Sequence, residues 1–144
     1  MLEFSEGLRN GLMVSGSMKS LLDDGFLRIY SGAVPNSPND SLASAVLLCE
    51  LSNGGDGVTF ESTASNGTLV KSTSEVWNGN NVASGTASFF RFVKAGDSGA
   101  ASTTAWRIQG TVGVAGADMN LTNPTLTAGA PNTLHHFYLT MPEQ

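Results

Sequence analysis

The sequence predicts an all-β fold, a β-sandwich or jelly-roll of about eight short strands with a short N-terminal helical arm. Three observations predict it. Apolar and polar residues alternate with a period of two from Gly25 onward, Gly and Asn clusters interrupt this alternation at short intervals, and charged residues make up only 13% of the chain. The 144 residues therefore divide into an N-terminal helical arm, residues 1–24, and a β-sandwich domain, residues 25–144.

The arm has the residue spacing of an amphipathic helix. Phe4, Leu8 and Leu12 are four residues apart, so they fall on one face, and Met13 lies beside them. Glycines within this segment weaken a helix by about 1 kcal/mol each, and so short a helix is not stable alone. We expect the apolar stripe to lie against a neighbouring chain, or alternatively against the β domain of its own chain.

A second helical turn follows Gly16, which breaks the first helix. Ser17 is suited to cap this turn, because its hydroxyl can accept a hydrogen bond from a free backbone N–H. Asp23 and Asp24 are expected to end the turn, and Gly25 stands where a helix stop is expected.

The remainder alternates with the period of β-strands. Loops are expected at 33–41, which contains two prolines, and at the small-residue segments 95–104 and 116–131. Asn and Gly clusters predict turns at 53–57 and 78–81. The predicted strands are 25–31, 45–52, 58–61, 68–72, 75–77, 86–94, 106–114 and 133–141, and a further short strand fits 119–121.

Some predicted strands are apolar on both faces. Phe90 and Phe92 share one face of segment 86–94, while Phe89, Arg91 and Val93 share the other. This pattern indicates either an outer surface that another chain covers or a curved sheet that is packed on both sides within one domain. Apolar residues on two faces also predict self-association of the protein as a dimer or trimer.

The charge pattern argues against two classes of partner. The formal net charge is −5, and the seven Lys and Arg residues are scattered along the chain. No basic stripe forms, so we expect binding neither to nucleic acid nor to anionic membranes. The sequence also shows neither a signal peptide nor an apolar run of roughly 20 residues, the length that spans a bilayer.

No catalytic or metal-binding pattern is specific enough to predict an enzyme. Cys49 lies in an apolar run and is expected to be a buried free thiol. His135 and His136 are adjacent on a predicted strand, so they should point to opposite faces, one partly buried and one exposed. Segment 53–57 lacks the ligand pattern of a calcium loop. We therefore expect no catalytic residues, no metal and no cofactor.

Aromatic residues leave one alternative open. Trp77, Trp106, Tyr30 and Tyr138 could line a sugar-binding face, because aromatic rings stack on sugars. The alternative function is accordingly a receptor- or carbohydrate-binding β-sandwich domain. Tryptophan in a β-sandwich is also common in the core.

Four phrases of the chain resemble a known group of proteins. They are Phe4-Ser5-x-Gly7-Leu8-Arg9-Asn10, the segment Gly25-Phe26-Leu27-Arg28-Ile29-Tyr30-Ser31-Gly32, Phe90-Arg91-Phe92-Val93 followed by Ala95-Gly96-Asp97, and Arg107-Ile108-Gln109-Gly110-Thr111-Val112-Gly113. Together they resemble small head decoration, or cement, proteins of tailed bacteriophages. The resemblance extends over most of the chain, and its phrases are structural rather than chemical.

The resemblance implies a structural virion protein with a β-sandwich or jelly-roll body. Such a protein is made in the host cytoplasm, binds the major capsid protein on the outer surface of the capsid and cements neighbouring capsomers. The apolar stripe formed by Phe4, Leu8, Leu12 and Met13 then becomes the expected contact with the capsid or a neighbouring subunit.

Overall fold

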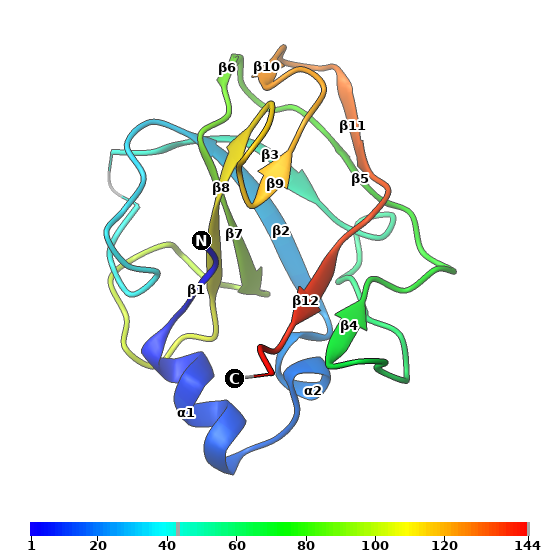
Figure 1. Cartoon of the computed structure of the whole chain (residues 1–144). Coiled ribbons are helices and arrows are strands. Elements are labelled where there is room, and N and C mark those ends of the chain that lie inside the picture. The colour runs from blue at the N-terminus through cyan, green and yellow to red at the C-terminus, as the bar shows by residue number, and fades with distance from the viewer. Residues whose placement is uncertain (43, 144) are drawn as a thin grey trace.

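A computed structural model describes residues 1–42 and 44–143 (Figure 1). The described residues are mostly β, with 38% in strands or isolated bridges and 10% in two helices. This confirms the predominance of β structure predicted from the period-two alternation. Ala43 and Gln144, both within the predicted β domain, lie outside the described residues.

Both helices are capped by serine. Helix α1 spans Glu6–Val14, and the Ser5 side chain accepts a hydrogen bond from the Leu8 N–H. Helix α2 spans Met18–Leu22 and begins with a reciprocal capping box between Ser17 and Ser20. The predicted cap at Ser17 is therefore confirmed, and α2 ends at the expected place, with Asp23 as its C-terminal cap.

The strands form one main sheet and three two-stranded ladders. In the main sheet the order is β1-β8-β7-β2-β3, all antiparallel, and β9 adds to β8 in parallel. The ladders pair β10 with β6, β11 with β5 and β12 with β4, also antiparallel. The bounds are β1 Glu3–Phe4, β2 Gly25–Ser31, β3 Val46–Leu51, β4 Thr68–Val70, β5 Trp77–Asn80, β6 Gly85–Thr86, β7 Phe89–Lys94, β8 Ile108–Gly113, β9 Met119–Asn120, β10 Thr125–Leu126, β11 Pro131–Leu134 and β12 Tyr138–Thr140.

The strongest sequence patterns gave the correct strands. Strand β2 has the predicted bounds, and β3, β7 and β8 lie inside the segments predicted for them. The short strands β1 and β10 were not predicted, because a two-residue strand has no period to detect. Segment 58–61 makes only isolated bridges, at Val58 and Phe60.

Two segments near the C-terminal ladders differ from the prediction. Residues 78–81 do not form a turn, because Asn78–Asn80 belong to β5 and pair with β11. Gly79 is needed there, since a Cβ at this position would lie 2.1 Å from the Glu50 carbonyl oxygen. Segment 133–141 divides into β11 and β12, and residues 135–137 between them are not in a strand.

An aromatic cluster occupies the centre of the core. Phe60 packs edge-on against Trp77 at a centroid distance of 5.5 Å, and Phe137 stacks on Phe92 at 6.3 Å. Trp77 and Phe92 are 0% exposed. The cluster joins the main sheet, through β7, to the segments around β4, β5 and β12, so the core lies between the main sheet and the smaller ladders.

Residues 1–24 pack against residues 25–144 of the same chain, which is the alternative expected for the apolar stripe. Strand β1 pairs with β8, and Leu8, Leu21 and Leu22 belong to the same buried cluster as the sheet residues. A Cβ on Gly7 would lie 2.3 Å from the Thr104 carbonyl oxygen, so this glycine permits close packing of α1 on the loop before β8. Residues 1–24 are thus part of the β body.

Candidate protein-binding surface

The predicted contact stripe is mostly occupied by the chain itself. Leu8 is 0% exposed in the core, and Phe4 and Leu12 are half-buried against it. Only Met13, 83% exposed, is free for another molecule, together with the neighbouring Val14. The prediction that all four residues contact a neighbouring chain is therefore corrected, because burying Leu8, Phe4 and Leu12 internally completes the chain's own core.

The outer face of the main sheet carries a row of polar side chains. The cross-strand register places Glu3, Gln109, Arg91, Arg28 and Glu50 side by side on β1, β8, β7, β2 and β3. Arg28 donates to Glu50 at 2.7 Å, Arg91 donates to Gln109 at 2.8 Å, and Gln109 donates to Glu3 at 3.3 Å. Neighbouring side chains in this row therefore supply part of one another's hydrogen bonds.

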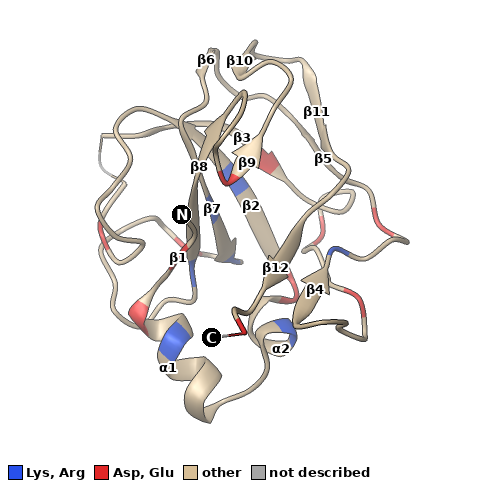
Figure 2. Cartoon of the chain, in the orientation of Figure 1, with Lys and Arg blue, Asp and Glu red and all other residues tan. Residues whose placement is uncertain are grey.

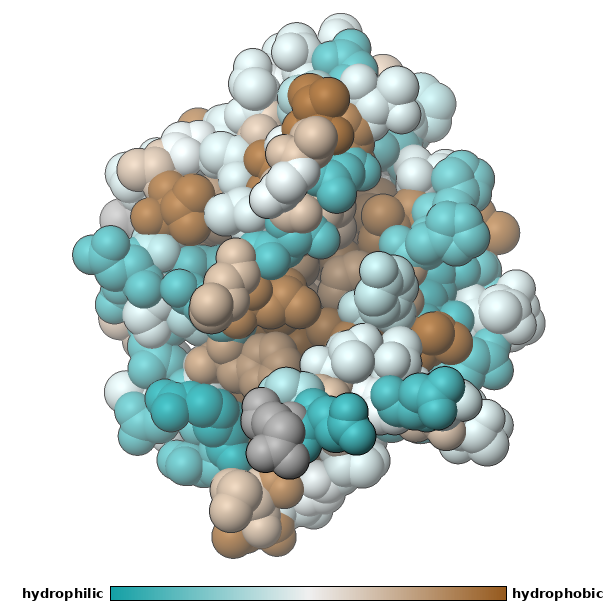
Figure 3. All heavy atoms as spheres, in the orientation of Figure 1, coloured by the Kyte–Doolittle hydropathy of each residue, from teal (hydrophilic) through white to brown (hydrophobic). Residues whose placement is uncertain are grey.

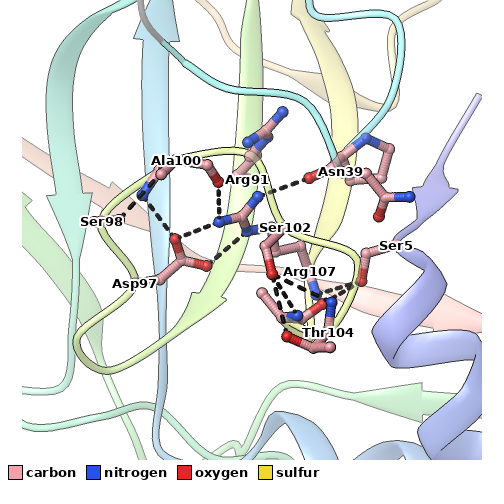
Figure 4. Close-up of polar contacts among 12 residues, drawn as sticks. Ser5, Asn39, Arg91, Asp97, Ser98, Ala100, Ser102, Thr104 and Arg107 are labelled. Atoms are coloured by element: carbon pink, nitrogen blue, oxygen red, sulfur yellow. Dashed lines mark hydrogen bonds and ion pairs between the residues drawn. The ribbon is translucent and has the colours of Figure 1, made fainter.

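Arg107 connects this face to the loop that follows β7 (Figure 4). Its Nε lies 2.7 Å from Oδ2 of Asp97 and its Nη2 lies 2.8 Å from Oδ1, which is a two-bond ion pair with both side chains buried. Its Nη1 donates to the Pro38 carbonyl, and its Nη2 also donates to the Ala100 carbonyl. Burial opposes the charged form of Asp97, but hydrogen bonds from Arg107 and the Gly99 N–H outweigh it and lower the pKa of this carboxyl.

The guanidinium of Arg91 is less completely hydrogen-bonded than that of Arg107. Its guanidinium donates to Gln109 and, at 3.1 Å, to the Ser37 carbonyl, while its buried Nη1 finds no hydrogen-bond partner among residues 1–42 and 44–143. Burial, reinforced by the nearby Arg107 charge, lowers the pKa of Arg91 to about 10.

These arginines hold two loops over the sheet. Arg91, Arg107 and Gln109 all bond to backbone carbonyls between residues 35 and 38. Segment 95–105 is held by Arg107 and by Ser5, whose hydroxyl donates to the Ala105 carbonyl at 2.7 Å. Phe89, Arg91 and Val93, on the outer face of β7, are therefore buried, while Phe90 and Phe92 are buried in the core on the other face. Segment 86–94 is therefore apolar on both faces because the sheet is packed on both sides within one domain, and not because another chain covers it. Residues of all four phrases that carry the resemblance meet around this network.

The surface over β6, β10 and β11 has a different character. Segments 81–88 and 120–134, which we call the uncharged face, contain no Asp, Glu, Lys or Arg. In Figure 2 the upper end of the molecule, around these strands, is entirely tan. Exposed Ser, Thr, Asn and Ala side chains dominate it, and Val82 is 66% exposed. Depletion of charge is typical of the centre of protein–protein interfaces.

Sequence reasoning missed this face, although its signal is present in the sequence. A run of 24 residues, 119–142, and another of 15, 76–90, lack Asp, Glu, Lys and Arg altogether. The pairing of β6 with β10, and of β5 with β11, brings the two runs together.

The candidate chemical groups lie apart from one another. Cys49 is buried as expected, and burial with Glu50 nearby raises the pKa of its thiol to about 11. His135 and His136 are both exposed, which corrects the expectation that one of them is partly buried, because residues 135–137 leave the strand. Asp23 accepts hydrogen bonds from Lys19 and from the Phe60 N–H, so it has a structural role. Residues 53–57 form the predicted turn, with positive φ at Gly54 and Gly55.

The four aromatic residues do not form a common platform. Trp77 is 0% exposed and Tyr30 is 5% exposed, and Tyr30 stacks on Phe89 within the chain. Trp106 is half-buried against the core, and only Tyr138 is exposed. A flat sugar-binding face made of these rings is therefore absent from the described part of the chain.

Neither a cluster of metal-ligating side chains nor a membrane-spanning helix is present among residues 1–42 and 44–143. They contain no group of three or more His, Cys, Asp or Glu side chains placed to hold a metal ion. Neither of the two helices they form has the length and apolar character needed to cross a membrane.

Comparisons with known proteins give no relative. No protein-family model, no curated protein and no solved structure matches this chain.

Proposed function

We propose that this chain is a structural virion protein that binds the outer surface of a phage capsid and cements neighbouring capsomers. The uncharged face, residues 81–88 and 120–134, carries the proposal as the capsid contact. A surface without charges can be covered by another protein without the cost of desolvating an ion, which is large for an unpaired charge.

The internal bonding of the protein supports a role in holding capsomers together. The buried ion pair between Arg107 and Asp97 and the row of polar side chains tie loops, helix α1 and the main sheet together. A body held in this way changes little on binding, which keeps the entropic cost of attachment low. We further propose that the main sheet and the smaller ladders form the two layers of a sandwich of the jelly-roll type.

Many symmetric copies on one shell strengthen a contact that is weak in each copy. A contact that buries apolar surface contributes about 25 cal/mol per Å², and symmetric copies on a shell multiply that contribution. We propose that copies also contact one another on the capsid as dimers or trimers, so that each copy is held by the major capsid protein and by its neighbours.

Co-sedimentation with purified empty shells tests the proposal. The protein should pellet with shells to a saturating stoichiometry and stay in the supernatant without them. Val82→Glu and Thr125→Glu place a buried charge in the proposed contact and should each reduce the bound fraction at least about tenfold. Thermal unfolding of both variants should match that of the unsubstituted protein, since both positions are exposed.

Met13→Glu is the matched control. It adds the same charge at a position that is 83% exposed on α1, at the opposite end of the molecule from β6 and β10 (Figure 1). Loss of binding in Met13→Glu alone would move the contact to α1 and contradict the assignment to the uncharged face. Absence of co-sedimentation by the unsubstituted protein would contradict the proposed function itself.

A further inference from the structure

A cleft opens between β9 and the segment that contains β11 and β12. Two adjoining hollows of about 390 and 440 Å³ lie along it and share Asn120, Leu134 and His136. Phe90 and Phe137 form part of its floor and pack edge-to-face at 6.0 Å. Figure 3 shows the hollow near the middle of this face, with hydrophobic atoms at its floor, in the region where Figure 1 places β9 and β12.

One wall of the cleft is a free strand edge. Asn78 exchanges backbone hydrogen bonds with Ser52, so its neighbour across the ladder, Thr133, turns its own N–H and C=O away from β5. The Val70 carbonyl likewise accepts from Glu61, so Tyr138 directs its backbone groups away from β4. Thr140 faces the same way, because it follows Tyr138 by two residues.

The opposite wall is a free edge as well. Leu121 donates its N–H to the Gly113 carbonyl, so Asn120, one residue earlier, directs its backbone N–H and C=O away from β8. For the outward groups of Asn120, Thr133, Tyr138 and Thr140, no backbone hydrogen bond is found among the described residues. Unpaired strand edges of this kind are templates for an added strand.

The cleft disfavours a charged occupant. Among residues 1–42 and 44–143, Asp118 is the one Asp, Glu, Lys or Arg that lines it. Its carboxylate already pairs with the N-terminal ammonium at 2.9 Å and accepts from Thr111. The other lining groups are aliphatic, aromatic, amide, hydroxyl and imidazole side chains.

We propose that this cleft binds an extended, uncharged peptide segment of a different protein, which adds as a β-strand along the edge of β11 and β12. A second copy is a poor donor within the described residues. Its β1 is already paired with β8, its Met141 N–H is bonded to Gly67, and its loop 33–42 is fixed by the arginines over the main sheet. The proposal does not depend on whether the protein binds a capsid.

A short peptide of alternating threonine and valine, labelled with fluorescein at its N-terminus and amidated at its C-terminus, is a suitable probe. Its fluorescence anisotropy should rise to saturation as protein is added. The same peptide with alternate backbone amides N-methylated should not bind, because it can no longer pair with a strand edge. Absence of saturation at up to about 1 mM protein, the weak limit of specific binding, would overturn the proposal.

Thr133→Pro removes one outward donor without breaking the ladder with β5, since proline is tolerated at an edge position whose N–H faces outward. It should weaken peptide binding about fivefold, the share of one hydrogen bond. Thr133→Ala, which keeps the N–H, should bind as the unsubstituted protein does. If Thr133→Pro binds the peptide as tightly as the unsubstituted protein does, and the N-methylated peptide binds as tightly as the unmethylated one, the peptide does not bind by strand addition.

Hydrogen exchange gives an independent result. In the free protein the amides of Thr133, Tyr138 and Thr140 should exchange quickly, while those of Leu134 and Leu139, which face the ladders, should be protected. Added peptide should slow the first set. Slow exchange of that set in the free protein would mean that the edge is already paired, and would refute the proposal.

Discussion

Replacing Asp97 by asparagine tests whether the buried ion pair holds the loops on the main sheet. The substitution keeps the shape of the side chain and removes its charge, so Arg107, 2% exposed in its side chain, loses its carboxylate partner. Removing one partner of a buried pair costs about 3–5 kcal/mol. The asparagine oxygen can still accept one bond, and the carbonyls of Pro38 and Ala100 remain. We therefore expect a loss near the lower limit, about 3 kcal/mol.

Urea unfolding followed by tryptophan fluorescence measures this loss. The midpoint should fall while the slope of free energy against urea stays constant, since the unfolded chain exposes the same surface. Asp56→Asn is the matched control, because it removes the same charge from an exposed turn residue, and it should change the free energy of unfolding by less than about 0.5 kcal/mol. If both variants lose the same small amount of unfolding free energy, the ion pair does not hold the loops on the main sheet.

The same pair predicts a pH dependence. The pKa of Asp97 is lower in the folded protein than in the unfolded chain, so its contribution is complete above the unfolded value, about 3.9. The contribution is lost as pH falls through the folded pKa, because the unfolded chain binds the proton more readily. The difference in unfolding free energy between the unsubstituted protein and Asp97→Asn should therefore shrink below about pH 4, and a difference that is constant down to acid unfolding would contradict the assignment.

Three further outcomes follow from buried groups. Arg91→Met should destabilise the fold in urea less than Arg107→Met does, because it removes a guanidinium with an unpartnered Nη1 and a lowered pKa; the reverse order would contradict this account. Cys49 should react with a thiol reagent only as fast as the protein unfolds, and rapid labelling of the folded protein would show that the thiol is accessible. Gly79→Ala should cost about 1–3 kcal/mol in the same unfolding assay, since its Cβ would collide with the Glu50 carbonyl, and a neutral effect would mean that β5 can move.

The sequence predicted best where one periodic pattern extends over a whole strand. Strand β2 was predicted with its bounds, because alternation persists through it and glycine flanks it at both ends. The cap of α2 was predicted for a similarly local reason, since Ser17 follows a helix-breaking glycine. These features depend on neighbours in the chain and can be found without tertiary contacts.

Features that depend on distant contacts were not predictable in this way. Gly79 lies in a sequence that is typical of a turn, and only the closeness of the Glu50 backbone shows why glycine stands in a strand. Leu8 and Leu12 lie on helix α1 as their spacing predicted, whereas Phe4 lies in β1, before the Ser5 cap. Spacing alone does not tell which surface covers an apolar stripe. The chain's own core covers it.

The candidate protein-binding surface was likewise predictable only where it depends on neighbours in the chain. The two uncharged runs are visible in the sequence, whereas their union into one face depends on the pairing of β5 with β11 and β6 with β10. The alternation of segment 86–94 predicted Arg91 on one side of its strand, but not the loops that bury Arg91 and Gln109.

The proposed function is tested most directly by a cryo-EM reconstruction of virus particles produced by the cells that carry the gene for this chain. We predict repeated density of this fold on the outer surface of the capsid, with β6, β10 and β11 directed toward the major capsid protein and α1 directed away from it. Particles whose outer capsid surface lacks this density, or which carry it only in the tail or inside the shell, would contradict the claim.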